Sequence, residues 1–195
     1  MIAIVDTGGA NLTSVTNALD RLDTNWVITK DEETIRSASH VLLPGVGAAA
    51  DSMSRIEKDG LVEIITSLKQ PVLGICLGMQ LLFERSEEGN VSCLNIIPGE
   101  VKAIPKKPLL SIPHMGWNQV HYKSDSVLFE GIPENSHFYF IHSFMGTVNE
   151  FTIGYTQYGQ EVPALVQKDN FYGAQFHPEK SGEAGSQFLR NFLKL

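Results

Sequence analysis

The first 80 residues alternate short apolar runs with amphipathic segments, and this alternation constrains the fold more than any other feature. Leu12, Val15, Leu19 and Leu22 recur at spacings of three and four, which predicts a helix, and Asp31–Glu33 opens a second one. Strands separated by helices predict a parallel sheet with crossovers on both faces. Parallel strands are buried on both sides and are therefore continuously apolar. The predicted strands are residues 2–6, 26–30, 41–43 and 72–75.

The second half contains successive β-type runs separated by turn residues, and a closing helix. The helix is predicted at 182–195, where Phe188, Leu189, Phe192 and Leu193 are apolar. Because no helical segments separate these strands, we expect antiparallel pairing that continues the same core. The expected fold is α/β, with a mixed central sheet whose N-terminal half is parallel, flanking helices and additional antiparallel strands. The expected strands are residues 101–104, 117–122, 138–141, 152–155, 164–166 and 171–176.

Composition excludes several classes of protein. The 195 residues carry a net charge of −7, which disfavours nucleic acid or an anionic membrane as a partner. No apolar stretch approaches the ~18 residues of a membrane span, and the first residues lack the basic region of a signal peptide. The two cysteines, Cys76 and Cys93, form no disulfide framework, so we expect a cytoplasmic protein. Without repeats or linkers, residues 1–195 are expected to form one domain.

The strongest local motif is Gly74-Ile75-Cys76-Leu77-Gly78, which follows a predicted strand and leads into the helix-like run Leu81-Leu82-Phe83. This is a nucleophile elbow with cysteine as the nucleophile. The flanking glycines remove Cβ atoms where strand and helix crowd together. A helix N-terminus would favour the thiolate, and the Leu77 N–H would hold an oxyanion. The alternative is a buried structural cysteine, which is how we interpret Cys93.

A nucleophilic cysteine needs a base, and the base needs an orienting group. His177-Pro178-Glu179 follows a predicted strand, and residues two apart in an extended chain point the same way, so Glu179 is expected beside His177. A carboxylate there fixes the tautomer of the imidazole ring and stabilises its charged form. By itself His-Pro-Glu also suits a surface turn, and only its combination with Cys76 favours the base.

The loop Pro44-Gly45-Val46-Gly47 ends the third predicted strand. Ligands of parallel sheets gather beyond the carboxyl ends of the strands, which places this loop beside the elbow. Its glycines would let a peptide flip and supply a second oxyanion N–H. A simple strand-to-helix turn is the alternative.

In this order and spacing, these segments resemble the class I (triad) glutamine amidotransferases over essentially the whole chain. Further motifs are similar to the glutaminase subunits of imidazole glycerol phosphate synthases. They are Asp6–Asn11, Pro113-His114-Met115-Gly116-Trp117-Asn118, Phe138–Ser143 and Phe171–Ser181. Ala10 and Phe144 depart from the residues common at these positions, and neither belongs to the triad.

The resemblance implies that Cys76 attacks the side-chain amide of L-glutamine, that His177 moves the proton and that Glu179 orients His177. Water then hydrolyses the γ-glutamyl thioester. The residues implied to hold the oxyanion are Leu77 and the loop Gly45, Val46 and Gly47. The residues implied to bind glutamine are Gln80, Glu88 and the backbone of His142, Ser143 and Phe144. From the residues alone, Gln80 and Glu88 suit a solvated helix end equally well.

The resemblance also implies a partner, a (β/α)₈ cyclase subunit that receives ammonia in a heterodimer and makes imidazole glycerol phosphate and an aminoimidazole carboxamide ribotide. Asn11, Trp117 and Lys180 are implied at that interface, although Trp117 also suits a core and Lys180 a solvated surface. We expect no cofactor and no metal, because the sequence lacks the relevant motifs. Two alternatives are the glutaminase of another amidotransferase, such as pyridoxal phosphate synthase, and a non-catalytic module on the same fold.

Overall fold

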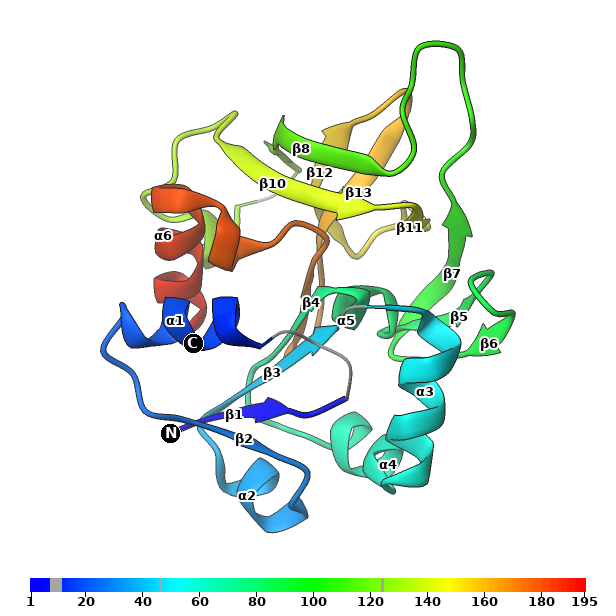
Figure 1. Cartoon of the computed structure of the whole chain (residues 1–195). Helices are drawn as coiled ribbons and strands as arrows, with labels where there is room; N and C mark the ends of the chain where they lie inside the picture. Colours follow the sequence, from blue (N-terminus) through cyan, green and yellow to red (C-terminus); the bar gives the residue numbers. More distant parts are fainter. Residues whose placement is uncertain (8–11, 46, 124) are drawn as a thin grey trace.

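The structure is a computed structural model that describes residues 1–7, 12–45, 47–123 and 125–195. In these ranges the strands form an eight-stranded sheet and two smaller ones. The large sheet has the order β2-β1-β3-β4-β14-β13-β12-β9, the second pairs β10 with β8, and the third has the order β11-β7-β5-β6. Helices flank the large sheet on both sides, as Figure 1 shows.

The strands and helices have the following bounds. The strands are β1 (Ile2–Val5), β2 (Trp26–Thr29), β3 (His40–Gly45), β4 (Val72–Cys76), β5 (Phe83–Ser86), β6 (Val91–Ser92), β7 (Ile97–Ala103), β8 (His114–Gln119), β9 (His121–Tyr122), β10 (His137–His142), β11 (Phe144–Gly146), β12 (Thr152–Gln157), β13 (Glu161–Lys168) and β14 (Phe171–Ala174). The helices are α1 (Thr13–Asp20), α2 (Glu32–Ser37), α3 (Ala49–Lys58), α4 (Leu61–Thr66), α5 (Leu77–Gln80) and α6 (Gly182–Phe192), with the 3₁₀ turns η1 (Val127–Phe129) and η2 (Pro178–Lys180).

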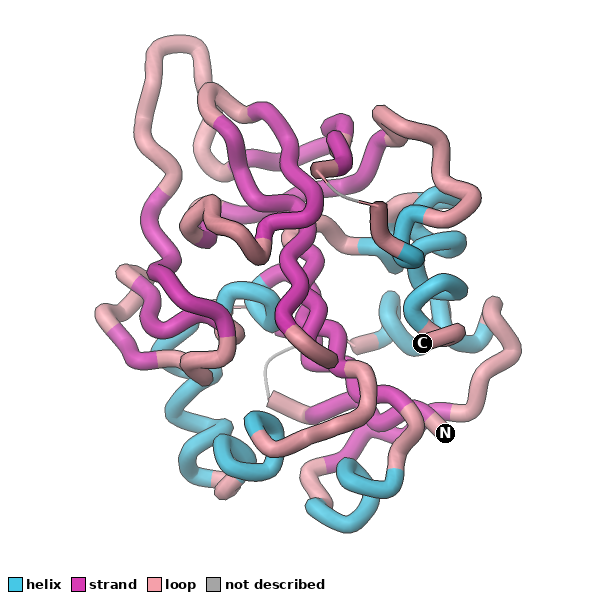
Figure 2. Tube along the Cα trace, turned by 180° about the vertical axis from the view of Figure 1, so that it is seen from behind, coloured by secondary structure: helices cyan, strands magenta, loops and turns pink. Residues whose placement is uncertain are grey.

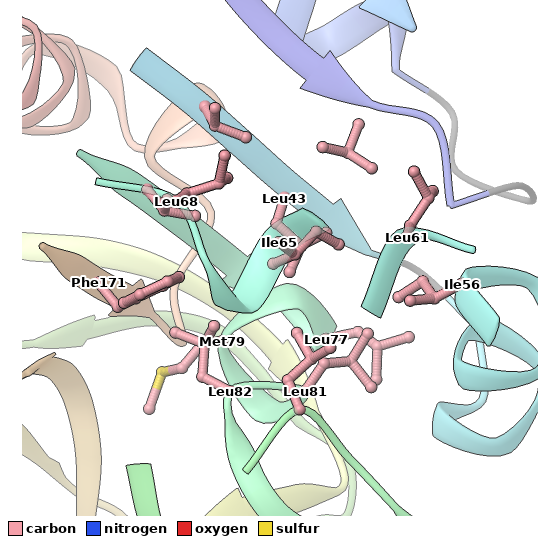
Figure 3. Packing of buried hydrophobic residues seen from close by; sticks show 14 of the residues in the cluster. Leu43, Ile56, Leu61, Ile65, Leu68, Leu77, Met79, Leu81, Leu82 and Phe171 are labelled. Carbon is pink, nitrogen blue, oxygen red and sulfur yellow. The ribbon is translucent and has the colours of Figure 1, made fainter. Parts of the chain in front are cut away.

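Two hydrophobic clusters cover the faces of the large sheet. One gathers side chains of α2, α3 and α4 with those around α5, and Figure 3 shows part of it. The other contains residues of α1 and α6 and the inner face of β10. Seen from behind in Figure 2, the strands run through the middle of the molecule with helices at both sides. The elbow residues therefore lie between two buried layers.

The parallel half agrees with the sequence prediction. β1 to β4 pair in parallel, and β14 joins them parallel to β4 before β13, β12 and β9 continue antiparallel. Gly60 has a positive φ of 68° and separates α3 from α4. β2 is an edge strand and only partly buried, because it has a neighbour on one side.

The second half contains the additional antiparallel strands that the sequence predicted, and these strands are divided among three sheets. Only β14, β13, β12 and β9 extend the central sheet, whereas the other late strands form two separate sheets. β10 pairs with β8 in an antiparallel ribbon on the side where β4 ends, since the Cys76 side chain reaches the carbonyl of Ile141. Residues with a high preference for strands indicate that a strand forms, but they do not specify which other strand it pairs with.

Candidate active site

The elbow is a tight, sterically crowded turn. Cys76 ends β4 with φ 54° and ψ −108°, a conformation that a residue with a side chain rarely adopts. A Cβ on Gly74 would lie 2.5 Å from the carbonyl oxygen of Gly78, and a Cβ on Gly78 would lie 1.7 Å from the carbonyl oxygen of Leu43. The two glycines therefore let the turn pack directly on β3, as predicted.

The segment after the elbow differs from the prediction. α5 is a single turn, and Leu81 and Leu82 form a turn that leads into β5 at Phe83. The chain leaves the helix because the carbonyls of Leu81 and Leu82 accept hydrogen bonds from the N–H groups of Leu94 and Ile96. Phe83 then begins β5 and pairs with Ile97 of β7. One turn carries little of the dipole that a long helix provides, so other groups must support a thiolate.

His177 and Glu179 lie in direct contact. His177 Nδ1 and Glu179 Oε1 are 2.7 Å apart, and the two side chains are 6% and 4% exposed. The reason differs from the one predicted, because Pro178–Lys180 form a 3₁₀ turn and no extended strand. The His177 backbone is anchored by its N–H to the carbonyl of Tyr139. This places the imidazole against the pocket wall.

The electrostatics favour a proton on His177. Burial lowers the pKa of His177, but its interactions with Cys76 and Glu179 outweigh this effect and raise the pKa to about 10. Among the described residues His177 Nε2 has no hydrogen-bond partner, so Cys76 is near without forming a hydrogen bond. Such contacts are often loose before substrate binds. His177 is therefore a strong acceptor for the thiol proton.

Two other groups contact the sulfur. The Cys76 thiol donates to the carbonyl of Ile141 over 3.7 Å, and the Gln175 amide donates to Cys76 Sγ over 3.7 Å. Gln175 is fully buried. A donor aimed at sulfur favours its negative charge, which is the support that the short α5 helix cannot supply.

One pocket of about 410 Å³ is lined by Cys76, Ile141 and His177, together with most of the predicted substrate residues. A more open groove of about 830 Å³ lies between Tyr122 and Glu134, but it contains neither Cys76 nor His177. The smaller pocket is therefore the candidate active site, because it contains the nucleophile and the base. Its lining residues are Gly45, Gly47, Cys76, Leu77, Gln80, Glu88, Pro113, Ile141, His142, Ser143, Phe144, His177 and Lys180.

Gln80 and Glu88 are not the solvated helix-end residues that their sequence context also allowed. Gln80 is 4% exposed, and its amide donates to the carbonyl of Phe144 and to Gln175 Oε1, each over 2.9 Å. Glu88 lies in the turn after β5, and its carboxylate accepts from the N–H of Ala49 at the start of α3 over 2.8 Å. Both side chains are thus fixed toward the pocket.

The backbone of His142, Ser143 and Phe144 forms another wall. The carbonyl of Ser143 accepts from Ile104 N–H, and that of Phe144 accepts from Gln80 and from His142 Nδ1. These oxygens are already used and would repel a carboxylate. Any contact with the substrate carboxylate must come from backbone N–H groups here.

The predicted oxyanion groups lie beside the nucleophile. Gly45 is the register partner of Cys76 in the β3–β4 pair, which confirms that this loop adjoins the elbow. Leu77 begins α5, so its N–H is among those that a helix leaves without a partner within the helix. Gly47 has a φ of 97°, which favours glycine. Val46 lies outside the described residues.

The predicted interface residues occupy different places. Trp117 on β8 is 56% exposed, so the core interpretation is wrong, and its ring meets Tyr139 edge-on with centroids 6.1 Å apart. Lys180 lines the pocket, and its ammonium lies 5.9 Å from the centre of the Tyr139 ring. Asn11 lies outside the described residues.

Sequence reasoning missed Gln175 and the roles of His114 and Asn118. Gln175 follows β14 directly and precedes His177 by two residues, and the apolar residues around it were the available signal. His114 and Asn118 were noted only as part of a motif. Their spacing of four along a strand places both on the same face of β8, which alternation could have indicated.

A buried cysteine at an elbow beside a carboxylate-paired imidazole is the arrangement of enzymes with a thiol nucleophile. The model of the family "Glutamine amidotransferase class-I" matches residues 3–195. The chain belongs to this family.

Full-length relatives agree with this assignment, and solved structures share the fold. The chain is 50% identical over 193 residues to the imidazole glycerol phosphate synthase subunit HisH of Haemophilus influenzae, covering 99% of this chain and 96% of the relative. It is 47% identical over 195 residues to subunit HisH 2 of Legionella pneumophila strain Paris, covering 100% and 98%. A glutamine amidotransferase crystal structure has a TM-score of 0.75 at 16% identity, covering 99% and 97%. One from Thermotoga maritima has a TM-score of 0.67 at 15% identity, covering 99% and 82%. These two structures show the shared fold.

Among the helices of the described ranges, none is long and apolar enough to cross a membrane. Within the same ranges, no three His, Cys, Asp or Glu side chains are grouped as a metal site requires. That the reaction needs no metal or cofactor stays a prediction.

Proposed function

We propose that the chain is the glutaminase subunit of an imidazole glycerol phosphate synthase. It hydrolyses L-glutamine to glutamate and ammonia, and it passes the ammonia to a cyclase subunit in L-histidine biosynthesis. The strongest support for the chemistry is that Cys76 and His177 line one pocket and that Glu179 is paired with His177 behind it. The full-length relatives named HisH support the assignment to this synthase.

The reaction begins when His177 takes the thiol proton and Cys76 attacks the amide carbon of the glutamine side chain. The negative charge on the former carbonyl oxygen is held by Leu77 N–H and by the Gly45–Gly47 loop. His177 returns the proton to the leaving nitrogen, and ammonia departs. A γ-glutamyl thioester remains, and water activated by His177 hydrolyses it to glutamate and the free thiol.

Glu179 acts on this sequence through His177. Its carboxylate holds the Nδ1–H side of the ring, so Nε2 faces the pocket and exchanges the proton. Glu88 supplies a fixed negative charge for the ammonium group of glutamine, and Gln80 forms part of the surface that selects its length. The pocket thereby offers complementary groups at both ends of the substrate.

The thiol donates to the carbonyl of Ile141, so its proton must be redirected toward His177 before transfer. Ile141 and Tyr139 lie on β10, and both backbone carbonyls contact the triad segments. A partner that binds the outer side of β10 would therefore act directly on the nucleophile and the base.

That outer side carries an apolar surface, which we call the outer ladder: Met115, Trp117, Tyr139 and Ile141. Trp117 pairs with Tyr139 across the strands, and Met115 pairs with Ile141. Met115, Trp117 and Ile141 are 64%, 56% and 38% exposed. Contiguous exposed aromatic and apolar side chains are typical of protein interfaces. The outer ladder and Lys180 are the surface proposed for the (β/α)₈ cyclase, with Asn11 as a further contact.

The decisive experiment compares the two cysteines. We expect Cys76→Ala to lower glutamine hydrolysis by the cyclase complex at least about 1,000-fold, because no other described thiol lines the pocket. Cys93→Ala is the matched control. Burial raises the pKa of the Cys93 thiol to about 11, so Cys93 is unreactive and its variant should keep full activity.

Glutamate release by the purified complex measures both variants, and copurification with the cyclase shows that each still folds and assembles. Undiminished turnover in Cys76→Ala would disprove the mechanism. A wild-type chain that is inactive with the cyclase would disprove the subunit assignment.

A further inference from the structure

A line of buried polar side chains connects the nucleophile to strand β8, and most of it takes no part in the reaction described above. From Cys76 it passes through Gln175 and Gln80 to the carbonyl of Phe144. His142 Nδ1 lies 2.7 Å from the same carbonyl oxygen. Gln175, Gln80 and His142 are 0%, 4% and 6% exposed.

The line continues through a second histidine. His142 Nε2 lies 2.9 Å from His114 Nδ1, and His114 Nε2 lies 3.2 Å from the amide nitrogen of Asn118. The Asn118 amide also donates to the carbonyl of Gln157 over 3.0 Å. We call Asn118, His114 and His142, together with the Phe144 carbonyl, the histidine relay.

The Phe144 carbonyl at the end of the histidine relay sets the direction of every hydrogen bond in it. A carbonyl oxygen only accepts, so His142 carries its proton on Nδ1 and its Nε2 accepts from His114. His114 then carries its proton on Nδ1, and its Nε2 accepts from the Asn118 amide. Burial lowers the pKa of His114 to about 4 and that of His142 to about 3, which agrees with two neutral rings.

The Phe144 carbonyl also fixes the direction of the hydrogen bonds that lead through Gln80 and Gln175 to Cys76. The Phe144 carbonyl requires a donor from Gln80, so the Gln80 amide nitrogen faces it and also donates to Gln175 Oε1. Gln175 must then present its amide nitrogen to Cys76 Sγ. A change in the orientation of the Phe144 carbonyl would therefore alter groups at the substrate and at the sulfur.

His114 is held on the inner face of β8. Its ring stacks between Phe140 and Tyr158, with centroids 4.8 and 3.9 Å away. It is 2% exposed, whereas the adjacent Met115 belongs to the outer ladder. Because alternate residues of a strand face opposite sides, β8 carries the relay inward and the proposed partner surface outward.

We propose that His114 is a positioning residue that acts through His142 to hold the Phe144 carbonyl, and with it Gln80 and Gln175, in the orientation that glutamine binding requires. The kinetic consequence rests on the proposed function. The protonation pattern of the two rings does not, so the two can fail separately.

The first experiment reads the tautomers directly. The ¹⁵N resonances of the histidine rings in the full wild-type chain should show His114 and His142 neutral at pH 7, both with the proton on Nδ1. The exposed His137 serves as an internal reference. A proton on Nε2 of either ring, or a doubly protonated ring, would overturn the proposal. This measurement needs no variant and no activity.

The second experiment separates positioning from packing. His114→Phe keeps a ring between Phe140 and Tyr158 but removes both nitrogens, and we expect the KM for glutamine of the cyclase complex to rise about fivefold with kcat changed less than twofold. His114→Gln restores a donor and an acceptor and should recover most of the loss. His121→Phe makes the same exchange on β9, outside the relay, and should leave KM unchanged.

Asn118→Ala removes the far donor from a half-buried position and covers the case in which His114→Phe does not fold. A smaller rise in KM, about twofold, is expected. Wild-type KM in every relay variant that folds would refute the positioning role. An inactive wild-type complex would refute the proposed function instead, and the tautomer measurement would still decide the arrangement of the relay.

Discussion

The elbow on β4 and the β8–β10 ribbon approach the same sulfur atom but are built in opposite ways. All residues of β4 are buried, and the strand lies between β3 and β14 in the middle of the sheet. The ribbon has two strands, and its outer ladder is exposed. The nucleophile is therefore held by close packing on one side and by a partly uncovered element on the other.

This difference assigns the two elements different tasks: β4 positions the nucleophile, and the ribbon can respond to a partner. Packing around Gly74 and Gly78 leaves the elbow no space to move, which fixes the Cys76 backbone. In the described part of the chain, the ribbon forms hydrogen bonds with Cys76 and His177 through the carbonyls of Ile141 and Tyr139. An element with one free face responds to a partner more readily than a strand buried on both sides.

The largest expected effect tests the packing of the elbow. Gly78→Ala would place a methyl group 1.7 Å from the carbonyl oxygen of Leu43, a backbone atom that cannot move aside without disturbing β3. We expect the free energy of unfolding to fall by at least about 3 kcal/mol. Urea denaturation followed by circular dichroism measures this loss.

Gly60→Ala is the matched control, because a Cβ on Gly60 meets no atom within 4 Å although its φ is +68°. It should lower the unfolding free energy by about 1 kcal/mol, from backbone strain alone. Equal losses in the two variants would show that the elbow is not held by close packing.

An intermediate effect tests the free face of the ribbon. Trp117→Ala should weaken binding of the cyclase by about 2 kcal/mol, or roughly 30-fold in Kd, because it removes the largest side chain of the outer ladder. The unfolding free energy should change little, since Trp117 is 56% exposed. Calorimetric titration with the cyclase measures the change.

Ile28→Ala is the control for Trp117→Ala, because Ile28 is 41% exposed on β2, the edge strand of the large sheet, and the ribbon is a separate sheet. It should bind the cyclase with wild-type affinity. Wild-type affinity in Trp117→Ala would place the partner elsewhere on the molecule.

The effect that is smallest for each pH unit compares the two regions by pH. His114 and His142 have folded-state pKa values lowered from 6.5 to about 4 and about 3, so below pH 6.5 the unfolded chain binds protons that the folded chain does not. Stability is lost as the pH falls from 6.5 toward 4, by at most about 1.4 kcal/mol per pH unit and histidine.

The raised pKa of His177 makes stability depend on pH in the opposite direction. Its contribution is complete below pH 6.5 and is lost as the pH rises through about 10. Thermal unfolding between pH 4 and 6.5 should depend less on pH in His114→Phe than in the wild type, because this variant lacks one of the two rings whose pKa is lowered in the folded chain. An unchanged slope would mean that His114 is protonated equally in both states.

Much of the parallel half could be predicted because its signals are local. Apolar runs between helical periods identified β1 to β4, and glycines at fixed offsets identified the elbow. The contact between His177 and Glu179 was also expected, although the 3₁₀ turn that produces it was not. The expectation of one domain over 1–195 stays a prediction, as do the roles of the site residues.

The remaining errors concern residues whose environment is set by distant segments. Leu81, Leu82 and Phe83 have the composition of a helix, but hydrogen bonds from Leu94 and Ile96 draw them into a turn and a strand. The separate β8–β10 sheet and the burial of Gln175 likewise depend on contacts far along the chain. Periodicity does not contain this information, because it reports one segment at a time.

The amino-acid sequence by itself determined the kinds of chemical group and the local turns that present them: a thiol between glycines, an imidazole two residues before a carboxylate, and strands suited to burial. Only the tertiary structure decided which groups meet, because the parallel pairing of β4 with β14 brings together Cys76 and His177, which 100 residues separate in the chain. The same folding placed Gln175 on the sulfur and gave the histidine relay a single direction. Hydrogen-bond direction is a property of neighbours in space, and a chain read in order does not contain it.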